Sequence, residues 1–143
     1  MTIKRESVLC AAIIAVSLIL SLSLASAQDM TARDFYVEAQ KNIKEISVEE
    51  AKALMGKALF LDVRTMDEFI RGHIPGTEFL QRGLLEVAVS RKIPDKETHI
   101  VVYCGSGVRS GLATYTLKKM GYKNAENMLG GWNAWLRAGY PVE

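Results

Sequence analysis

Cys104 has the sequence surroundings of a reactive thiol. Residues 99–103 form an apolar, β-branched run that predicts a buried strand, and residues 104–110 read Cys-Gly-Ser-Gly-Val-Arg-Ser. Residues 110–120 predict a helix that ends at Gly121. The thiol is therefore expected where a strand ends and a short, glycine-containing loop leads into a helix N-terminus. Backbone amides in such a loop bind anions, and around a sulfur atom they favour the thiolate over the thiol.

The residues of this loop divide into a nucleophile and an anion-binding group. Cys104 is the predicted nucleophile. The predicted binding group consists of Gly105, Ser106, Gly107, Val108 and Arg109. The helix dipole stabilises an anion by about 0.3–1 kcal/mol, and the guanidinium of Arg109 is expected to add to this and to bind an anionic substrate. The hydroxyl of Ser106 either donates to the anion or only fills the turn. The alternative, a buried structural thiol, is less consistent with this strand–loop–helix arrangement.

Other polar and aromatic residues are assigned supporting roles. Asp62 and Arg64 lie at the carboxyl end of a second predicted strand, and with Glu68 they are expected to form a structural charge network behind the substrate-binding groups. His73 is interpreted as a turn residue. Trp132 and Trp135 are interpreted as core anchors on one helix face. The sequence has neither a zinc-type cysteine spacing nor a nucleotide-binding glycine signature, and no metal site is expected.

The first 27 residues have the pattern of a signal peptide. Two basic residues precede an apolar stretch, and residues 25–27 read Ala-Ser-Ala, which predicts cleavage before Gln28. An uncleaved membrane anchor is the alternative, because an apolar run of about 18 residues is at the lower limit for a membrane span. Either interpretation predicts an exported protein, most simply in a bacterial periplasm. Cleavage removes Cys10, so that Cys104 has no internal partner for a disulfide.

The charge balance excludes some classes of partner. The chain has 18 Lys and Arg residues against 16 Asp and Glu residues, a net charge of +2. This balance gives no indication of binding to nucleic acid or to a membrane surface. The length that remains after cleavage is sufficient for one domain with one core.

Predicted strands and helices alternate along this domain. Residues 28–42 are interpreted as an N-terminal extension with a helix starting near Thr31, and residues 43–143 as the domain. Strands are predicted at 43–46, 58–63, 77–80, 99–103 and 123–128, and helices at 47–55, 65–71, 84–91, 110–120 and 131–137. The alternation predicts an α/β fold with a central parallel sheet of about five short strands and helices on both faces. Ligands of such sheets bind at the carboxyl ends of the strands, where Cys104 is expected.

Three ordered motifs resemble the rhodanese family of sulfurtransferases. They comprise residues 61–64 with 68–69 and 72–76, then residues 103–110, and finally residues 130–135 with 139–142. The similarity extends over roughly residues 43–143, which is the whole expected domain. Single-domain, exported members of the family have the same organisation as this chain.

The resemblance implies a two-step reaction. The thiolate of Cys104 attacks the outer sulfur of thiosulfate or of a persulfide donor, and a thiol or protein acceptor, or cyanide in the test tube, then removes the sulfur from the enzyme persulfide. The loop amides from Gly105 through Arg109 hold that persulfide, and the family needs no cofactor. Relatives often have Arg or Lys directly after the cysteine, where this chain has Gly105. The missing charge favours less charged donors over the thiosulfate dianion.

Two further interpretations stay open at this point. Cysteine phosphatases and arsenate reductases on related folds have five residues between Cys and Arg, whereas residues 105–108 make four here. A shorter loop is expected to fit one sulfur atom better than a tetrahedral phosphate. Rhodanese-like domains also act as protein-binding modules, usually without the cysteine, or as sulfur carriers to a partner protein.

Overall fold

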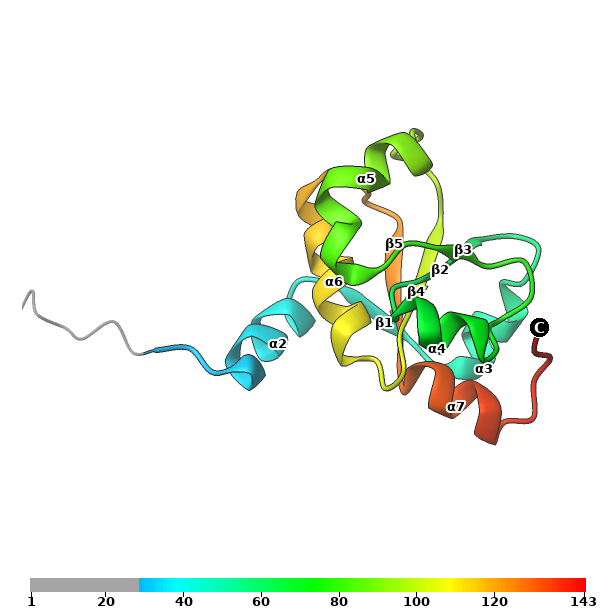
Figure 1. The fold of residues 1–143 in the computed structure, drawn as a ribbon. Coiled ribbons are helices and arrows are strands. Elements are labelled where there is room, and N and C mark those ends of the chain that lie inside the picture. The colour runs from blue at the N-terminus through cyan, green and yellow to red at the C-terminus, as the bar shows by residue number, and fades with distance from the viewer. Residues whose placement is uncertain (1–28) are drawn as a thin grey trace, which may run out of the picture. The chain divides into compact units, whose positions relative to one another are not determined.

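Five parallel strands form the central sheet, in the order β1-β5-β4-β2-β3 (Figure 1). The computed structural model describes residues 29–143, and the predicted signal peptide with Cys10 lies outside the described residues. The strands are β1 Lys44–Ile46, β2 Leu59–Asp62, β3 Glu78–Phe79, β4 Ile100–Tyr103 and β5 Ala125–Met128. Every neighbouring pair is parallel. The predicted fold class, a parallel α/β sheet of about five short strands, is confirmed.

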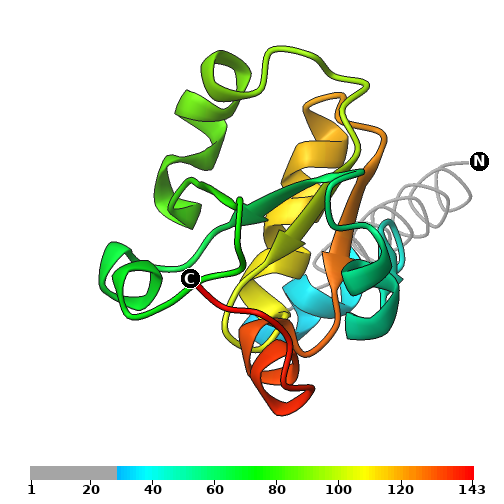
Figure 2. The same cartoon turned by 90° about the vertical axis from the view of Figure 1, so that its right-hand side faces the viewer.

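Helices cover both faces of this sheet (Figure 2). They are α2 Ala32–Gln40, α3 Val48–Ala53, α4 Met66–Ile70, α5 Leu85–Lys92, α6 Val108–Lys119 and α7 Gly131–Arg137, with a 3₁₀ turn η1 at Arg82–Leu84. One buried cluster joins the sheet to α5 and α6 and includes Val102, Leu85 and Leu117. The other joins it to α3 and α7 and includes Val101, Ala51 and Trp135. Alternate residues of β4 thus belong to opposite core layers, as strand geometry requires.

Three helices begin with capping boxes, which explains where they start. The hydroxyls of Thr31, Ser47 and Thr65 accept hydrogen bonds from the backbone amides three residues later. The acidic side chains at those later positions in turn accept hydrogen bonds from the backbone N–H groups of the three capping residues. Thr65 therefore fixes the start of α4 directly after β2, and the side chain of Glu68 belongs to this cap. The N-terminal helix α2 packs against α6, and among residues 29–143 no helix is long and apolar enough to cross a membrane.

Helix α6 begins two residues earlier than the sequence indicates. Its N-cap is Gly107, which has φ 98°, and Val108 is its first residue. A left-handed backbone is easily adopted only by glycine, so Gly107 turns the chain into the helix within three residues of Cys104. The start of α6 is therefore wrong in the sequence-based prediction, and the consequence is that Arg109 and Ser110 lie in the first helical turn.

Candidate active site

Cys104 is buried at the carboxyl end of β4, under the N-terminus of α6. Its side chain has no exposed surface. The backbone N–H of Gly107 donates to Sγ at 3.2 Å. The hydroxyl oxygen of Ser110 lies 3.4 Å from Sγ and 3.1 Å from the carbonyl oxygen of Gly107. The sulfur therefore faces donors from both the loop and the helix, which is the environment that stabilises a negative charge on it.

Further amides of the loop are available to an anion. Among residues 29–143, the backbone N–H groups of Gly105, Ser106 and the first three residues of α6 have no protein acceptor. Unsatisfied amides are a general property of helix N-termini, and here they belong to the residues that directly follow the cysteine. Of the predicted binding residues, Gly107 donates to Sγ and Gly105, Ser106 and Arg109 line the adjoining pocket, whereas the side chain of Val108 is exposed and does not line it. The side chain of Ser106 is exposed, so the hydroxyl next to the sulfur is that of Ser110.

Helix α7 fixes the opposite side of the loop. The N–H of Trp132 donates to the carbonyl of Cys104 at 2.7 Å, and the N–H of Asn133 donates to the carbonyl of Gly105 at 3.0 Å. This approach requires glycine at position 131, where φ is 53° and a Cβ atom would lie 2.3 Å from the carbonyl oxygen of Cys104. The double glycine before Trp132 thus allows α7 to bind the loop backbone directly, which leaves the loop amides facing the other way.

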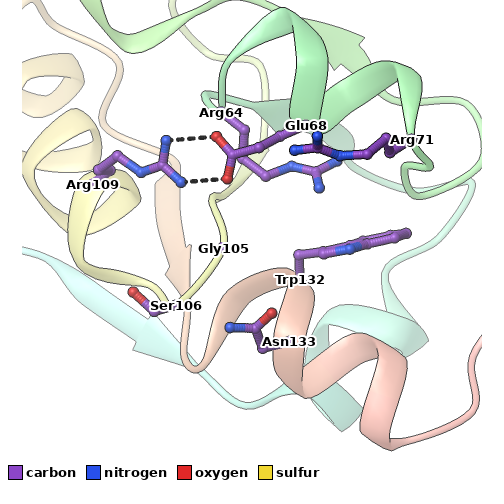
Figure 3. Close-up of a pocket in the computed structure, with 8 residues that line it drawn as sticks. All are labelled: Arg64, Glu68, Arg71, Gly105, Ser106, Arg109, Trp132 and Asn133. Carbon is purple, nitrogen blue, oxygen red and sulfur yellow. Dashed lines mark hydrogen bonds and ion pairs between the residues drawn. The ribbon is translucent and has the colours of Figure 1, made fainter.

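A pocket of about 420 Å³ opens beside the loop (Figure 3). Its lining residues are Arg64, Glu68, Arg71, Gly105, Ser106, Arg109, Trp132 and Asn133. Most of them are polar or charged, so that the pocket suits a small ionic substrate rather than an apolar one. Within the described residues 29–143, no group of three or more His, Cys, Asp or Glu side chains is arranged to hold a metal ion.

Arg109 lies at this pocket as an ion pair with Glu68. The two N–O distances are 2.8 Å and 2.7 Å, and the pair joins α6 to α4. Hydrogen bonds from Arg109, supported by the amide and hydroxyl of Thr65, lower the pKa of Glu68 to about 2. The same pairing raises the pKa of Arg109. The predicted anion-binding guanidinium is thus at the pocket, with its charge balanced by a carboxylate.

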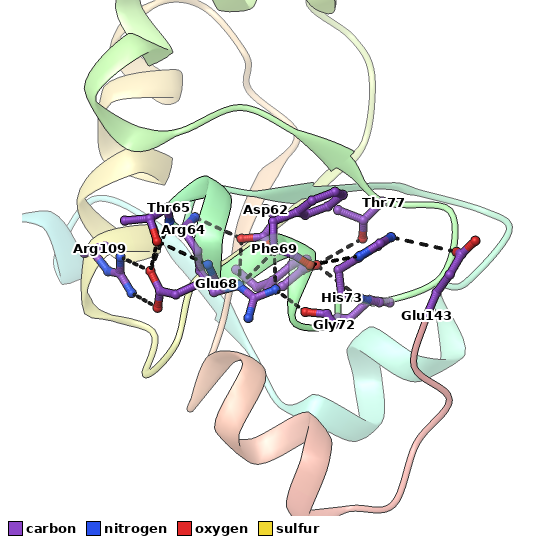
Figure 4. A network of polar contacts seen from close by, with 12 residues as sticks. Asp62, Arg64, Thr65, Glu68, Phe69, Gly72, His73, Thr77, Arg109 and Glu143 are labelled. Carbon is purple, nitrogen blue, oxygen red and sulfur yellow. Dashed lines mark hydrogen bonds and ion pairs between the residues drawn. The ribbon is translucent and has the colours of Figure 1, made fainter.

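Asp62 and Arg64 form a second, separate pair (Figure 4). Both side chains are buried, with Arg64 Nε 3.0 Å from Asp62 Oδ1 and Nη2 2.6 Å from Oδ2. Nη2 also donates to the carbonyl of Gly72 at 2.7 Å, and the guanidinium lies 4.7 Å above the ring of Trp132. The expected single network of Asp62, Arg64 and Glu68 is therefore two ion pairs, because Glu68 binds Arg109 instead.

Sequence reasoning assigned no site role to several residues that contact the pocket or the sulfur. Trp135 is fully buried against Phe60, as expected for a core anchor. Trp132 is half-buried: it packs against the core cluster that contains Trp135 and also lines the pocket, a second role that the sequence did not indicate. The missed residues are Glu68, Arg71, Ser110, Trp132 and Asn133. Their position in the sequence could have indicated a role at the site, because each lies within, or within a few residues of, one of the three motifs.

Comparison with known proteins accounts for these motifs. The model of the rhodanese-like domain matches residues 47–138. The chain belongs to this family. The matched range contains β2 to α7 and thus the whole pocket, whereas α2 lies outside it.

Relatives with assigned names fall in the same family. A sulfurtransferase of Allochromatium vinosum is 39% identical over 84 residues, which cover 59% of this chain and 77% of the relative. The thiosulfate sulfurtransferase GlpE of Haemophilus influenzae is 31% identical, and the match covers 71% of this chain and 96% of the relative. A solved structure from Rhodopseudomonas palustris, described as a possible tyrosine phosphatase, has TM-score 0.76 and 29% identity, covering 84% of this chain and 99% of that one.

Proposed function

We propose that this rhodanese-like protein is a sulfurtransferase that carries sulfane sulfur as a persulfide on Cys104. The observation that carries the proposal is the position of Sγ, which accepts the amide of Gly107 beneath a helix N-terminus whose remaining amides have no protein acceptor among the described residues. A persulfide places its negative charge one atom beyond Sγ. The free amides of the loop and of the first turn of α6 are the donors available to stabilise this charge.

The proposed reaction has two displacement steps. In the first, the Cys104 thiolate attacks the outer sulfur of thiosulfate, the new S–S bond forms, and the old S–S bond breaks with its electron pair leaving on sulfite. A persulfide donor reacts in the same way and leaves as a thiolate. In the second step, an acceptor thiolate attacks the outer sulfur of the enzyme persulfide and regenerates the Cys104 thiolate. Neither step changes the total charge or requires a cofactor.

The main alternative is cysteine-dependent phosphate ester hydrolysis, which the likeness to a possible tyrosine phosphatase brings forward. Two features of the site argue against it. Only four residues separate Cys104 from Arg109, where cysteine phosphatases have five. The guanidinium that would clamp a phosphate is held by Glu68 in a two-point pair. A small cradle that stabilises one charged sulfur atom supports the sulfurtransferase better.

Intact mass spectrometry tests the proposal. The protein is incubated with thiosulfate or glutathione persulfide, and we expect a gain of one sulfur atom that cyanide or a thiol reverses. Cys104→Ser is expected to abolish the gain. Hydrolysis of a phosphate ester without any sulfur gain would replace our proposal with the phosphatase. If the sulfur moves only to one bound protein and not to small thiols, the protein is a carrier.

We also propose that the protein is exported, on the basis of its first 27 residues. Expression of the full chain in a bacterium, followed by fractionation and N-terminal sequencing, tests this. A periplasmic product that begins at Gln28 is expected. A product that stays in the membrane fraction with its N-terminus intact would identify an uncleaved anchor instead.

A further inference from the structure

Three arginine side chains line the pocket, and their charges are not equally available. Arg64 is paired with the buried Asp62, and Arg109 is paired with Glu68. Arg71 lines the same pocket, is exposed, and has no carboxylate within ion-pair distance among residues 29–143. Figure 3 shows its side chain reaching from the end of α4 towards the other two arginines and Glu68. The pocket thus has one uncompensated positive charge.

We propose that Arg71 is the residue that recognises the anionic group of the sulfur donor. The proposal rests on the sulfurtransferase function above and adds a substrate class to it. A guanidinium binds an oxyanion such as the sulfonate end of thiosulfate through two parallel N–H donors. To bind an oxyanion, an arginine that is paired with a carboxylate must first give up that partner, whereas the exposed guanidinium of Arg71 has only solvent to give up.

The turn that carries Arg71 is held in place from two sides. Arg64, fixed by Asp62, donates to the carbonyl of Gly72 at 2.7 Å. A Cβ at Gly72 would lie 3.4 Å from Cζ2 of Trp132, so that the backbone beside Arg71 rests on the indole ring. The buried pair of Asp62 and Arg64 therefore positions the backbone from which Arg71 extends. The ion pair of Asp62 and Arg64 thus contributes to donor binding by holding this turn in place, and Arg71 is the residue that contacts the donor.

This arrangement changes the expected choice of donor. The sequence shows Gly105 in place of a common cation, and that absence favours donors with little charge. Arg71 supplies a cation to the same pocket from α4. We therefore infer that the preferred donors are those whose leaving group stays negative after transfer. Thiosulfate, which releases sulfite, belongs to this class. Cysteamine persulfide does not, because the thiolate that it releases carries an ammonium group and has no net charge.

Binding to a protein that cannot turn over gives the decisive measurement. Thiosulfate is titrated into Cys104→Ser and into the double variant Cys104→Ser/Arg71→Gln at constant ionic strength, following the loop amides by NMR. We expect Kd to rise about tenfold on loss of Arg71, as for a charge-assisted hydrogen bond. Arg71→Lys is expected to recover part of the affinity. Arg91→Gln on α5 is the matched control with the same change in net charge, and it should leave Kd unchanged.

A rate measurement on the active protein separates this inference from the proposed function. Arg71→Gln should lower kcat/KM for thiosulfate about tenfold and change it less than about twofold for cysteamine persulfide. Equal losses with both donors, or an unchanged Kd for thiosulfate, would overturn the role of Arg71. A protein that forms no persulfide with any donor refutes the sulfurtransferase, and the binding titration still decides whether Arg71 holds the anion.

Discussion

Glu68 and Arg109 form a two-point ion pair between the start of α4 and the first turn of α6, with N–O distances of 2.7 Å and 2.8 Å. Glu68 is held in turn by Thr65, whose amide donates to the carboxylate at 3.0 Å. The helix cap and the ion pair thus use the same carboxylate. As a result, Arg109, which lies in the first turn of α6 close to Cys104, is oriented by a residue of α4.

Glu68→Gln is expected to strengthen the binding of anionic donors. The glutamine keeps the capping geometry but releases the charge of Arg109, so that the pocket becomes more positive by one unit. We expect kcat/KM for thiosulfate to rise about three- to tenfold, which corresponds to roughly 0.6–1.4 kcal/mol. Steady-state kinetics checks this. The double variant Glu68→Gln/Arg109→Gln is the control and should lose the gain. A fall in kcat/KM for Glu68→Gln would mean that the pair itself positions the donor.

The same pair predicts a pH dependence of stability. The pKa of Glu68 is lowered from 4.5 to about 2, so its interactions stabilise the fold fully above pH 4.5 and are lost as the pH falls towards 2. The difference in free energy of unfolding between wild type and Glu68→Gln should therefore be constant at neutral pH and shrink in acid. Because the Glu68 side chain is 26% exposed, solvent screening keeps this difference small. Urea unfolding from pH 7 down to pH 3 measures it. A difference that grows in acid would contradict the assignment.

Gly105→Arg is expected to raise turnover with thiosulfate. A Cβ at this position would lie 3.4 Å from Arg109 Nη2 and 3.7 Å from Glu68 Oε1, so that the backbone has room for a side chain. The new guanidinium adds a charge to the pocket and competes for Glu68, which partly frees Arg109. Initial rates with thiosulfate test this, with Gly105→Gln as the uncharged control. Equal rates in both variants would show that charge at this position does not limit donor binding.

Gly131→Ala is expected to destabilise the domain and to disturb the loop that begins at Cys104. The added Cβ would lie 2.3 Å from the carbonyl oxygen of Cys104, and the residue has φ 53°. We expect a loss of about 3 kcal/mol or more in the free energy of unfolding. Gly139→Ala is the matched control, because Gly139 has φ 67° but nothing within 4 Å of its Cβ position, so the backbone alone costs about 1–2 kcal/mol. Similar losses in both variants would show that the close contact is relieved at no cost.

The sequence was sufficient for the elements that have strong local signals. A run of large apolar residues located β2, an apolar run rich in β-branched residues located β4, and the Thr65 and Ser47 capping boxes located α4 and α3. The start of α6 was not predictable in the same way. Val108 and Arg109 have no distinctive helix-start pattern, and the left-handed conformation of Gly107 that initiates the helix is a tertiary choice.

The pairing of charges in the pocket depends on strand order. Glu68 and Arg109 are 41 residues apart. They meet because β2 lies next to β4, with Asp62 opposite Tyr103, which brings the helices that follow the two strands side by side. The sequence contains all of these charges but not this adjacency. It therefore suggested one network where the structure has two pairs, and it left Arg71 without a role.

The hydrogen bonds from α7 to the carbonyls of Cys104 and Gly105 also make the loop dependent on a helix that comes later in the chain. Without residues 132 and 133, these two carbonyls lose their partners in α7. We therefore expect the backbone around Cys104 to be held in its native position only in a domain whose helix α7 has docked, so that a truncation before α7 would disturb the site even if the sheet formed.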